Sequence, residues 1–185
     1  MQTEVTLRLM TADEFERFRQ RNLSRYMQEL LLTGKTNVEA HALAEAQGAL
    51  EEVLPQGLET PRNYIMAAEN AAGETVGEVW CDTTEAETVF LNDFYVYEPH
   101  RRRGYGAAMI RAVEALAESQ SFGQIMTHVF HTNKVAIAMF TKRGYAPFGG
   151  EADGSIFLRK VYFEVPQHLS KKPLTGRSEV FCLGS

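Results

Sequence analysis

One stretch of the chain combines the residue types that bind anions. Three arginines and two glycines follow one another at Arg101, Arg102, Arg103, Gly104 and Gly106. Glycines lack side-chain bulk and let a phosphate approach several backbone N–H groups, and a helix that begins there adds roughly 0.3–1 kcal/mol of attraction for negative charge. The spacing therefore predicts a phosphate-binding turn, and a solvated turn without a ligand is the alternative for an isolated Gly-x-Gly.

The flanking residues predict a strand that enters this turn and a helix that leaves it. Residues 94–97 read FYVY, which favours a buried strand, and Pro99 ends its pairing. After Gly106, apolar residues recur at helical spacing, at Ile110, Val113, Leu116 and Ala117. The first N–H groups of a helix have no partner within it, so this turn offers free donors to a ligand.

A second stretch, residues 127–145, predicts a short strand, a loop and a helix. Asn133 is suited to cap the start of the helix, and Gly144 is suited to the left-handed residue that closes it. An apolar stripe lies between these two signals, at Ala136, Ile137 and Phe140.

Together the two stretches resemble the GNAT superfamily of acyl-CoA-dependent N-acetyltransferases. The Arg-x-x-Gly-x-Gly spacing, with Val96 five residues before Arg101, resembles the pyrophosphate-binding motif of that family. The second stretch resembles its Asn-x-x-Ala…Tyr-x-x-x-Gly-Phe segment. The turn has neither the Gly-x-Gly-x-x-Gly nor the Gly-Lys-Ser/Thr pattern of Rossmann and Walker sites. The phrase VYEPHRRRGYG and the segment 54–61 look like a little-characterised bacterial branch of the superfamily.

The resemblance implies acetyl-CoA as a co-substrate and no metal. It implies that pantetheine binds the backbone at Tyr95 and Val96, and that Asn133 and Phe140 complete the groove. The pyrophosphate would lie against Arg101, Arg102, Arg103, Gly104, Tyr105, Gly106 and Ala107. Phe140 departs from the family, which usually has a tyrosine at this position that protonates the leaving thiolate.

Catalytic residues are expected just before Phe94 in the strand that enters the glycine turn, and in the strand expected near 124–130. The phrase LNDFYV resembles the spermidine/spermine acetyltransferases, where a Glu-Asp pair serves base and amine-binding roles, but here the pair is Asn92-Asp93. An alkylamine with a pKa near 10.4 loses its proton at pH 7 at a cost of roughly 4–5 kcal/mol, so a base is valuable. We therefore expect catalytic roles for Asp93, Asn92 and His128. A structural aspartate and a histidine satisfied by the backbone are the alternatives.

The resemblance also suggests contacts to the acceptor. In the family the first two helices cover the acceptor side, which makes Tyr26 and the loop 54–61 substrate-binding candidates, together with Asp93 and Glu78. The alternatives are that Tyr26 packs on an amphipathic helix, that the loop is only a connector, and that Glu78 lies at a solvated strand edge.

Composition excludes several classes of protein. The chain has 185 residues, 44% of them hydrophobic and 23% charged, which suits one soluble globular domain. A net charge of −5 argues against nucleic acid as the main partner, and no apolar run reaches the roughly 20 residues that cross a membrane. Cys81 and Cys182 have no metal-ligand or redox spacing, which predicts free thiols in a reducing cytoplasm.

The order of the expected elements matches that family. The sequence predicts strands near 5–9, 64–69, 75–81, 88–97, 124–130, 145 and 156–164, and helices over 11–32, 37–53, 106–119 and 133–143. The first helix would begin with a Thr11–Glu14 capping box and the second with Asn37 as its cap. In the half-buried first strand the apolar side would consist of Val5, Leu7 and Leu9, and the second helix would carry Leu43, Leu50 and Val53. We expect an α/β (α+β) GNAT fold over residues 1–165, with a mixed, mostly antiparallel sheet and helices on both faces. Residues 166–185 would form an extended or disordered tail, whose apolar end is compatible with packing on a second copy in a homodimer.

The sequence thus predicts an N-acetyltransferase that passes the acetyl group of acetyl-CoA directly to a primary amine of a small molecule or peptide. The alternative is a non-catalytic acyl-CoA sensor or regulatory domain of the same fold. Asn92 and Phe140 favour the sensor, whereas Asp93 and His128 favour the enzyme.

Overall fold

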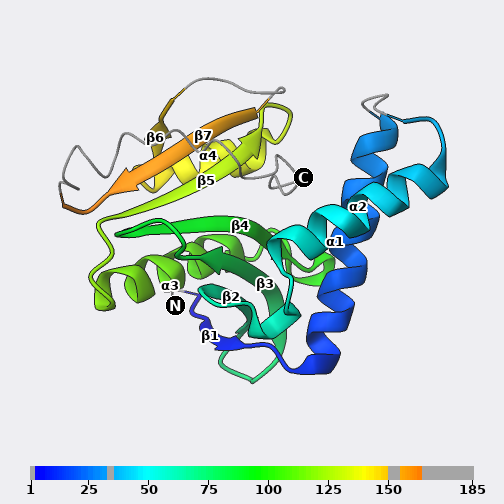
Figure 1. The fold of residues 1–185 in the computed structure, drawn as a ribbon. Coiled ribbons are helices and arrows are strands. Elements are labelled where there is room, and N and C mark those ends of the chain that lie inside the picture. Colours follow the sequence, from blue (N-terminus) through cyan, green and yellow to red (C-terminus); the bar gives the residue numbers. More distant parts are fainter. Residues whose placement is uncertain (1–2, 33–35, 150–154, 164–185) are drawn as a thin grey trace.

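A seven-stranded sheet runs through the protein in the order β1-β2-β3-β4-β5-β7-β6 (Figure 1). The structure, a computed structural model, describes residues 3–32, 36–149 and 155–163. The strands are β1 (Thr6–Leu9), β2 (Asn63–Glu69), β3 (Thr75–Asp82), β4 (Thr88–Val96), β5 (Gln124–Phe130), β6 (Ala146–Pro147) and β7 (Ser155–Val161). Only β4 and β5 pair in parallel, and the other neighbours are antiparallel. This confirms the predicted mixed, mostly antiparallel sheet.

Helices cover both faces of this sheet. They are α1 (Ala12–Leu32), α2 (Glu39–Val53), α3 (Tyr105–Ser119) and α4 (Lys134–Lys142), with two short 3₁₀ turns, η1 (Gly57–Glu59) and η2 (Glu98–His100). Successive side chains of β3 lie on opposite faces of the sheet. Val79 packs with residues of α3 and α4, whereas Trp80 packs with residues of α1 and α2. We call these two sides the α3 face and the α1 face.

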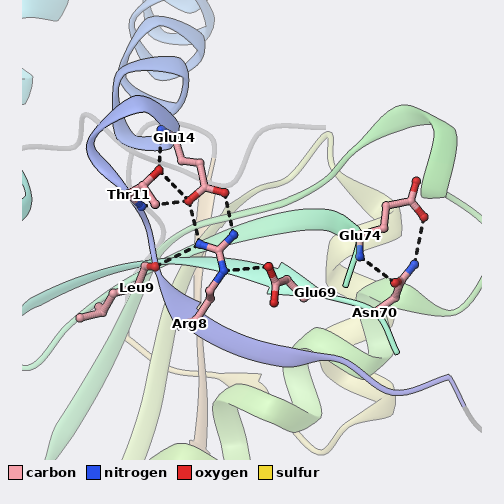
Figure 2. A network of polar contacts seen from close by, with 7 residues as sticks. All are labelled: Arg8, Leu9, Thr11, Glu14, Glu69, Asn70 and Glu74. Carbon is pink, nitrogen blue, oxygen red and sulfur yellow. Dashed lines mark hydrogen bonds and ion pairs between the residues drawn. The ribbon is translucent and has the colours of Figure 1, made fainter. Parts of the chain in front are cut away.

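A network of charged residues fixes the start of α1 (Figure 2). The backbone N–H of Thr11 donates to the Glu14 carboxylate over 2.9 Å, and the N–H of Glu14 donates to the Thr11 hydroxyl over 3.3 Å. Arg8 donates to both Glu14 oxygens over 2.7 and 2.8 Å and to Glu69 of β2 over 2.8 Å. The predicted capping box is therefore confirmed, and it also ties α1 to the edge of the sheet.

Three local predictions were wrong. Leu9 is 63% exposed, because the chain leaves β1 there and Met10 takes the buried place, its N–H donating to the Ile65 carbonyl over 3.0 Å. Asn37 does not cap α2, which begins after Val38, a residue without a side-chain cap. Leu43 is exposed, because α2 turns a face of small residues inward, at Ala42, Ala46, Ala49 and Leu50.

Two further expectations concern membranes and thiols. Within the described ranges, no helix is both long and apolar enough to cross a membrane. Cys81 is a buried free thiol, and its burial raises its pKa. Cys182 and the predicted tail over 166–185 lie outside the described residues, so the tail and its role in a homodimer stay predictions.

Candidate active site

The parallel strands β4 and β5 pair along only part of their length. Their register runs from Thr88 with Gln124 to Leu91 with Thr127. Beyond these pairs β4 continues against β3 as far as Val96, and β5 continues against β7 as far as Phe130. The Thr127 hydroxyl donates to the Leu91 carbonyl over 3.0 Å at the point of separation. From there the two strands diverge toward α1 and α2, as Figure 1 shows.

A β-bulge in β4 sets the direction of the predicted catalytic pair. Trp80 of β3 lies opposite Asp93, and Cys81 lies opposite Leu91, so Asn92 is the extra residue. Because of the bulge, the side chains of Asn92 and Asp93 both point to the α1 face. Asn92 Nδ2 donates to the Asp82 carboxylate over 2.9 Å.

Helix α1 supplies the partners of Asp93. This side chain is 2% exposed, and its two oxygens accept from Asn22 Nδ2 over 3.2 Å and from Arg25 Nη1 over 2.9 Å. Neither α1 residue was among the candidates from the sequence. The available signal was the helical spacing of Arg17, Arg21 and Arg25, which places three cations on one face of α1.

Glu78 of β3 is equally buried and is also paired with α1. The side chain is 1% exposed and forms an ion pair with Arg21. Burial lowers the pKa of the Arg21 guanidinium, because desolvation disfavours the charged form. Two carboxylates of the sheet are thus each matched by one arginine of the same helix.

The ring of Tyr95 is surrounded by guanidinium groups. The carbon centres of these groups lie 4.8 Å from the ring centroid for Arg21, 5.7 Å for Arg25 and 5.2 Å for Arg101. These distances are typical of cation–π contacts. We call Arg21, Arg25 and Arg101 the arginine cluster. It lies at the end of β4, where that strand has separated from β5.

His128 lies on the other separating strand. Its ring stacks on Phe157 of β7 with centroids 4.3 Å apart, and its Nε2 contacts the Ser155 hydroxyl. Strand alternation places His128 on the α1 face, because its neighbours Ile125 and Val129 belong to the core of the α3 face. Asp93 and His128 therefore face the same side of the sheet from the two strands that diverge.

The predicted phosphate-binding turn has the backbone that such a turn requires. Gly104 precedes α3 with φ +85°, and Arg102 is also left-handed with φ 61°. A Cβ on Gly106 would lie 3.0 Å from Met139 Sδ, so a glycine permits this turn to pack against α4. Arg101 Nε donates to the Val96 carbonyl over 3.1 Å. Arg102 and Arg103 are exposed beside the first N–H groups of α3, which fits a pyrophosphate.

The remaining candidates lie in different surroundings. Asn133 caps α4 as predicted, its side chain accepting from the Ala136 N–H over 3.0 Å. Phe140 is 0% exposed and packs edge-on against Phe94 and Tyr145, so its side chain belongs to the core. Tyr26 packs against the core of the α1 face. Their roles toward cofactor or acceptor stay predictions.

The loop over 54–61 packs against β2 and the start of α1, where a Cβ on Gly57 would lie 3.1 Å from the Phe15 ring. Together with α2 it borders a hollow of about 190 Å³ between the first two helices. The lining includes Phe15, Arg19, Leu23, Leu50, Leu54 and Gly57. Among the described residues, no three His, Cys, Asp or Glu side chains gather as they would around a metal ion.

The two parallel strands of the mixed sheet separate next to a helix that begins directly after Gly104. This arrangement is an acetyltransferase fold. Residues 45–145 match the acetyltransferase (GNAT) family, and the chain belongs to this family. It is 28% identical over 144 residues to the uncharacterized N-acetyltransferase YdgE of Bacillus subtilis, a match that covers 76% of this chain and 91% of that protein. The family supports acetyl transfer as the general activity.

Solved structures agree with this assignment of the fold. The crystal structure of the Bacillus subtilis acetyltransferase YycN superposes with a TM-score of 0.73 at 24% identity, covering 80% of this chain and 96% of that one. The PaiA N-acetyltransferase of Thermoplasma acidophilum, solved in complex with coenzyme A, gives a TM-score of 0.64 at 12% identity over 86% and 99% of the chains.

Proposed function

We propose that this protein transfers the acetyl group of acetyl-CoA directly to a primary amine of a small molecule or peptide. The observation that carries the proposal is the divergence of β4 and β5 directly beside the Gly104 turn. The coenzyme A bound to the structurally similar PaiA protein supports the choice of acyl carrier.

The turn and the end of β4 would hold the cofactor. The N–H groups that open α3 and the exposed Arg102 and Arg103 attract pyrophosphate oxygens. Tyr95 and Val96 lie beyond the last pair with β5, so the backbone edge that faces away from β3 would bind the pantetheine amides, with the Val96 carbonyl released by Arg101 if it takes part. Asn133 and the surroundings of Phe140 would line the opposite side. Acetyl-CoA supplies the acetyl group and a thiol as the leaving group.

His128 is the residue we assign to proton removal from the amine, directly or through a water molecule. Asp93 has both oxygens bound by α1, so we assign it to positioning Arg25 and Asn22 rather than to accepting the proton. Asn92 positions Asp82 in a similar way. A positioned base contributes about 10²–10⁴-fold, so His128→Gln should lower kcat/KM by at least a hundredfold. A kcat/KM within threefold of the wild type would exclude this role.

Calorimetry with acetyl-CoA and Arg102→Asn tests the cofactor site. Asparagine tolerates the left-handed backbone of position 102, so the substitution removes the charge without straining the turn. Arg62→Asn is a matched control, because Arg62 is also exposed and has φ 62°. We expect Arg102→Asn to weaken acetyl-CoA binding about tenfold and Arg62→Asn to leave it unchanged. Equal affinities for both variants would place the pyrophosphate elsewhere.

Release of free thiol in the presence of a broad panel of amines tests the transfer itself. We expect thiol release that depends on the amine and equals the N-acetylated product formed. Tight binding of acetyl-CoA without release by any amine would instead establish the non-catalytic sensor.

A further inference from the structure

Helix α1 directs two arginines at the end of β4, on the face of the sheet that also carries His128. Arg21 and Arg25 are one helical turn apart, and both guanidinium groups contact the ring of Tyr95. Asp93 and Tyr95 face the same side of the sheet as His128, which we assigned to proton removal. The arginine cluster therefore lies on the acceptor side of the diverging strands, whereas α3 packs on the opposite face.

The negative charges of this region are already matched. Glu78 pairs with Arg21, and Asp93 pairs with Arg25. Arg101 adds a third cation, whose ion pair with Glu98 is 3.8 Å long and lies at the surface, where Glu98 is 79% exposed. A polyamine would therefore find both buried carboxylates already paired, and Arg101 adds an excess positive charge, which disfavours a second positive charge on the acceptor.

Arg21 retains hydrogen-bonding capacity that the described residues do not use. Its Nε is buried and has no hydrogen-bond partner among them. A buried donor without a partner destabilises the protein, so a shift of its surroundings that brings a ligand oxygen to it is favoured. The planar fork of an arginine side chain matches the two oxygens of a carboxylate.

Building on the acetyl transfer proposed above, we propose that the acceptor is an amine that also carries a carboxylate, as in an amino acid or a short peptide. Arg21 and Arg25 bind the carboxylate beside the Tyr95 ring, and Arg101 closes the third side. The amine then points along the α1 face toward His128. The overall charge of −5 does not decide this binding, because the arginine cluster carries three positive charges against the two negative charges of Glu78 and Asp93.

Matched acceptors test the proposal. The panel contains the L-amino acids and dipeptides, their carboxamides, the corresponding amines without a carboxyl group, and polyamines, each assayed by thiol release. We expect the best carboxylated acceptor to exceed its carboxamide by at least tenfold in kcat/KM. Equal or better use of carboxamides or polyamines would overturn the inference and leave the acetyl transfer itself intact.

In Arg25→Gln the kcat/KM of the carboxylated acceptor should become nearly equal to that of its carboxamide, chiefly through a higher KM for the carboxylated acceptor. Arg25→Lys should restore part of the preference for the carboxylate. Arg21→Gln leaves Glu78 buried without its cation, so the double variant Arg21→Gln/Glu78→Gln keeps that pair neutral and should show the same loss. Arg19→Gln is the control on the same helix, since Arg19 pairs with Glu16 and borders the hollow between α1 and α2. A loss at Arg19 instead of Arg25 would place the carboxylate in that hollow and overturn the proposal.

Two measurements separate the remaining outcomes. A drop in acetyl-CoA affinity in Arg25→Gln, measured by calorimetry, would assign the cluster to the phosphates of the cofactor and overturn the proposal. If no panel member releases thiol, saturable binding of N-acetylated amino acids or dipeptides to the protein with CoA still supports it, and no binding by any of them overturns it. Failure of the acetyl transfer would appear separately, as absent binding of acetyl-CoA to the wild type.

Discussion

Helix α1 takes part in two groups of charges that differ in how fully their hydrogen bonds are used. At its start, Arg8 donates from all three guanidinium nitrogens to Glu14, Glu69 and the Leu9 carbonyl. Midway along the helix, Arg21 and Arg25 contact the Tyr95 ring, and the buried Nε of Arg21 has no hydrogen-bond partner within the described ranges. A complete network fixes architecture, whereas an incomplete one, at a place where strands diverge, is suited to a ligand.

The two groups also differ in burial. The Arg8 side chain is 36% exposed, so water screens its ion pairs and limits what each contributes. Glu78 and Asp93 are almost fully buried, so the arginines that neutralise them matter more. Substitutions in the two groups should therefore change different quantities by different amounts.

The largest effect is expected from Arg21→Met. Removing one partner of a buried ion pair typically costs about 3–5 kcal/mol, because the remaining charge has no compensation. We expect a loss of this size in the free energy of unfolding, measured by urea denaturation, and recovery of most of it in Arg21→Met/Glu78→Gln. A single variant as stable as the wild type would show that Glu78 is neutralised by another group.

Asp93→Asn should have an intermediate effect that concerns catalysis. Asparagine preserves the shape of the side chain but weakens its hold on Arg25, so we expect kcat/KM for the amine to fall about tenfold, or about 1.4 kcal/mol. Acetyl-CoA affinity, measured by calorimetry, should stay the same. Unchanged kcat/KM per folded molecule, with a lower melting temperature, would make Asp93 purely structural.

The smallest effect is expected at the start of α1. Hydrogen bonds from Arg8 lower the pKa of Glu14 to about 2, so its stabilising contribution is present above its ordinary pKa near 4.5 and is lost as the pH falls toward 2. Glu14→Gln should cost about 1 kcal/mol at pH 7, the usual size for a capping residue, and almost nothing near pH 2. Urea denaturation at both pH values measures this, and an equal loss at both would contradict the ion pair as its cause.

The sequence predicted the parts of the site that depend on local chemistry. Gly104, the start of α3 and the Asn133 cap follow from turn and capping preferences, which operate within a few residues. The direction of Asp93 could not be predicted, because one extra residue in β4 reverses strand parity. Its partners on α1 are about 70 residues away in sequence, where only a helical repeat of arginines marked them.

Burial also separates what the sequence could and could not predict. Leu43 and Leu50 look equivalent in the sequence, but the small residues of α2 decide which face packs, and Leu43 is left exposed. Phe140 fits the apolar stripe of α4 as predicted, yet its contacts with Phe94 and Tyr145 depend on tertiary packing that no local pattern encodes.

The short pairing of β4 with β5 has a consequence for how the chain folds. Strands β2, β3 and β4 form an antiparallel meander within residues 63–96, whereas the last three strands lie in the order β5-β7-β6. The hydrogen-bonded ladder between them spans only Thr88–Leu91 and Gln124–Thr127, and it requires the crossover through α3. The turns that join β2, β3 and β4 close short loops, whereas the parallel ladder closes the longer loop over residues 97–123 and costs more chain entropy. The separation of β4 from β5 is thus the continuation of a ladder that costs more loop-closure entropy than the β2–β4 meander beside it.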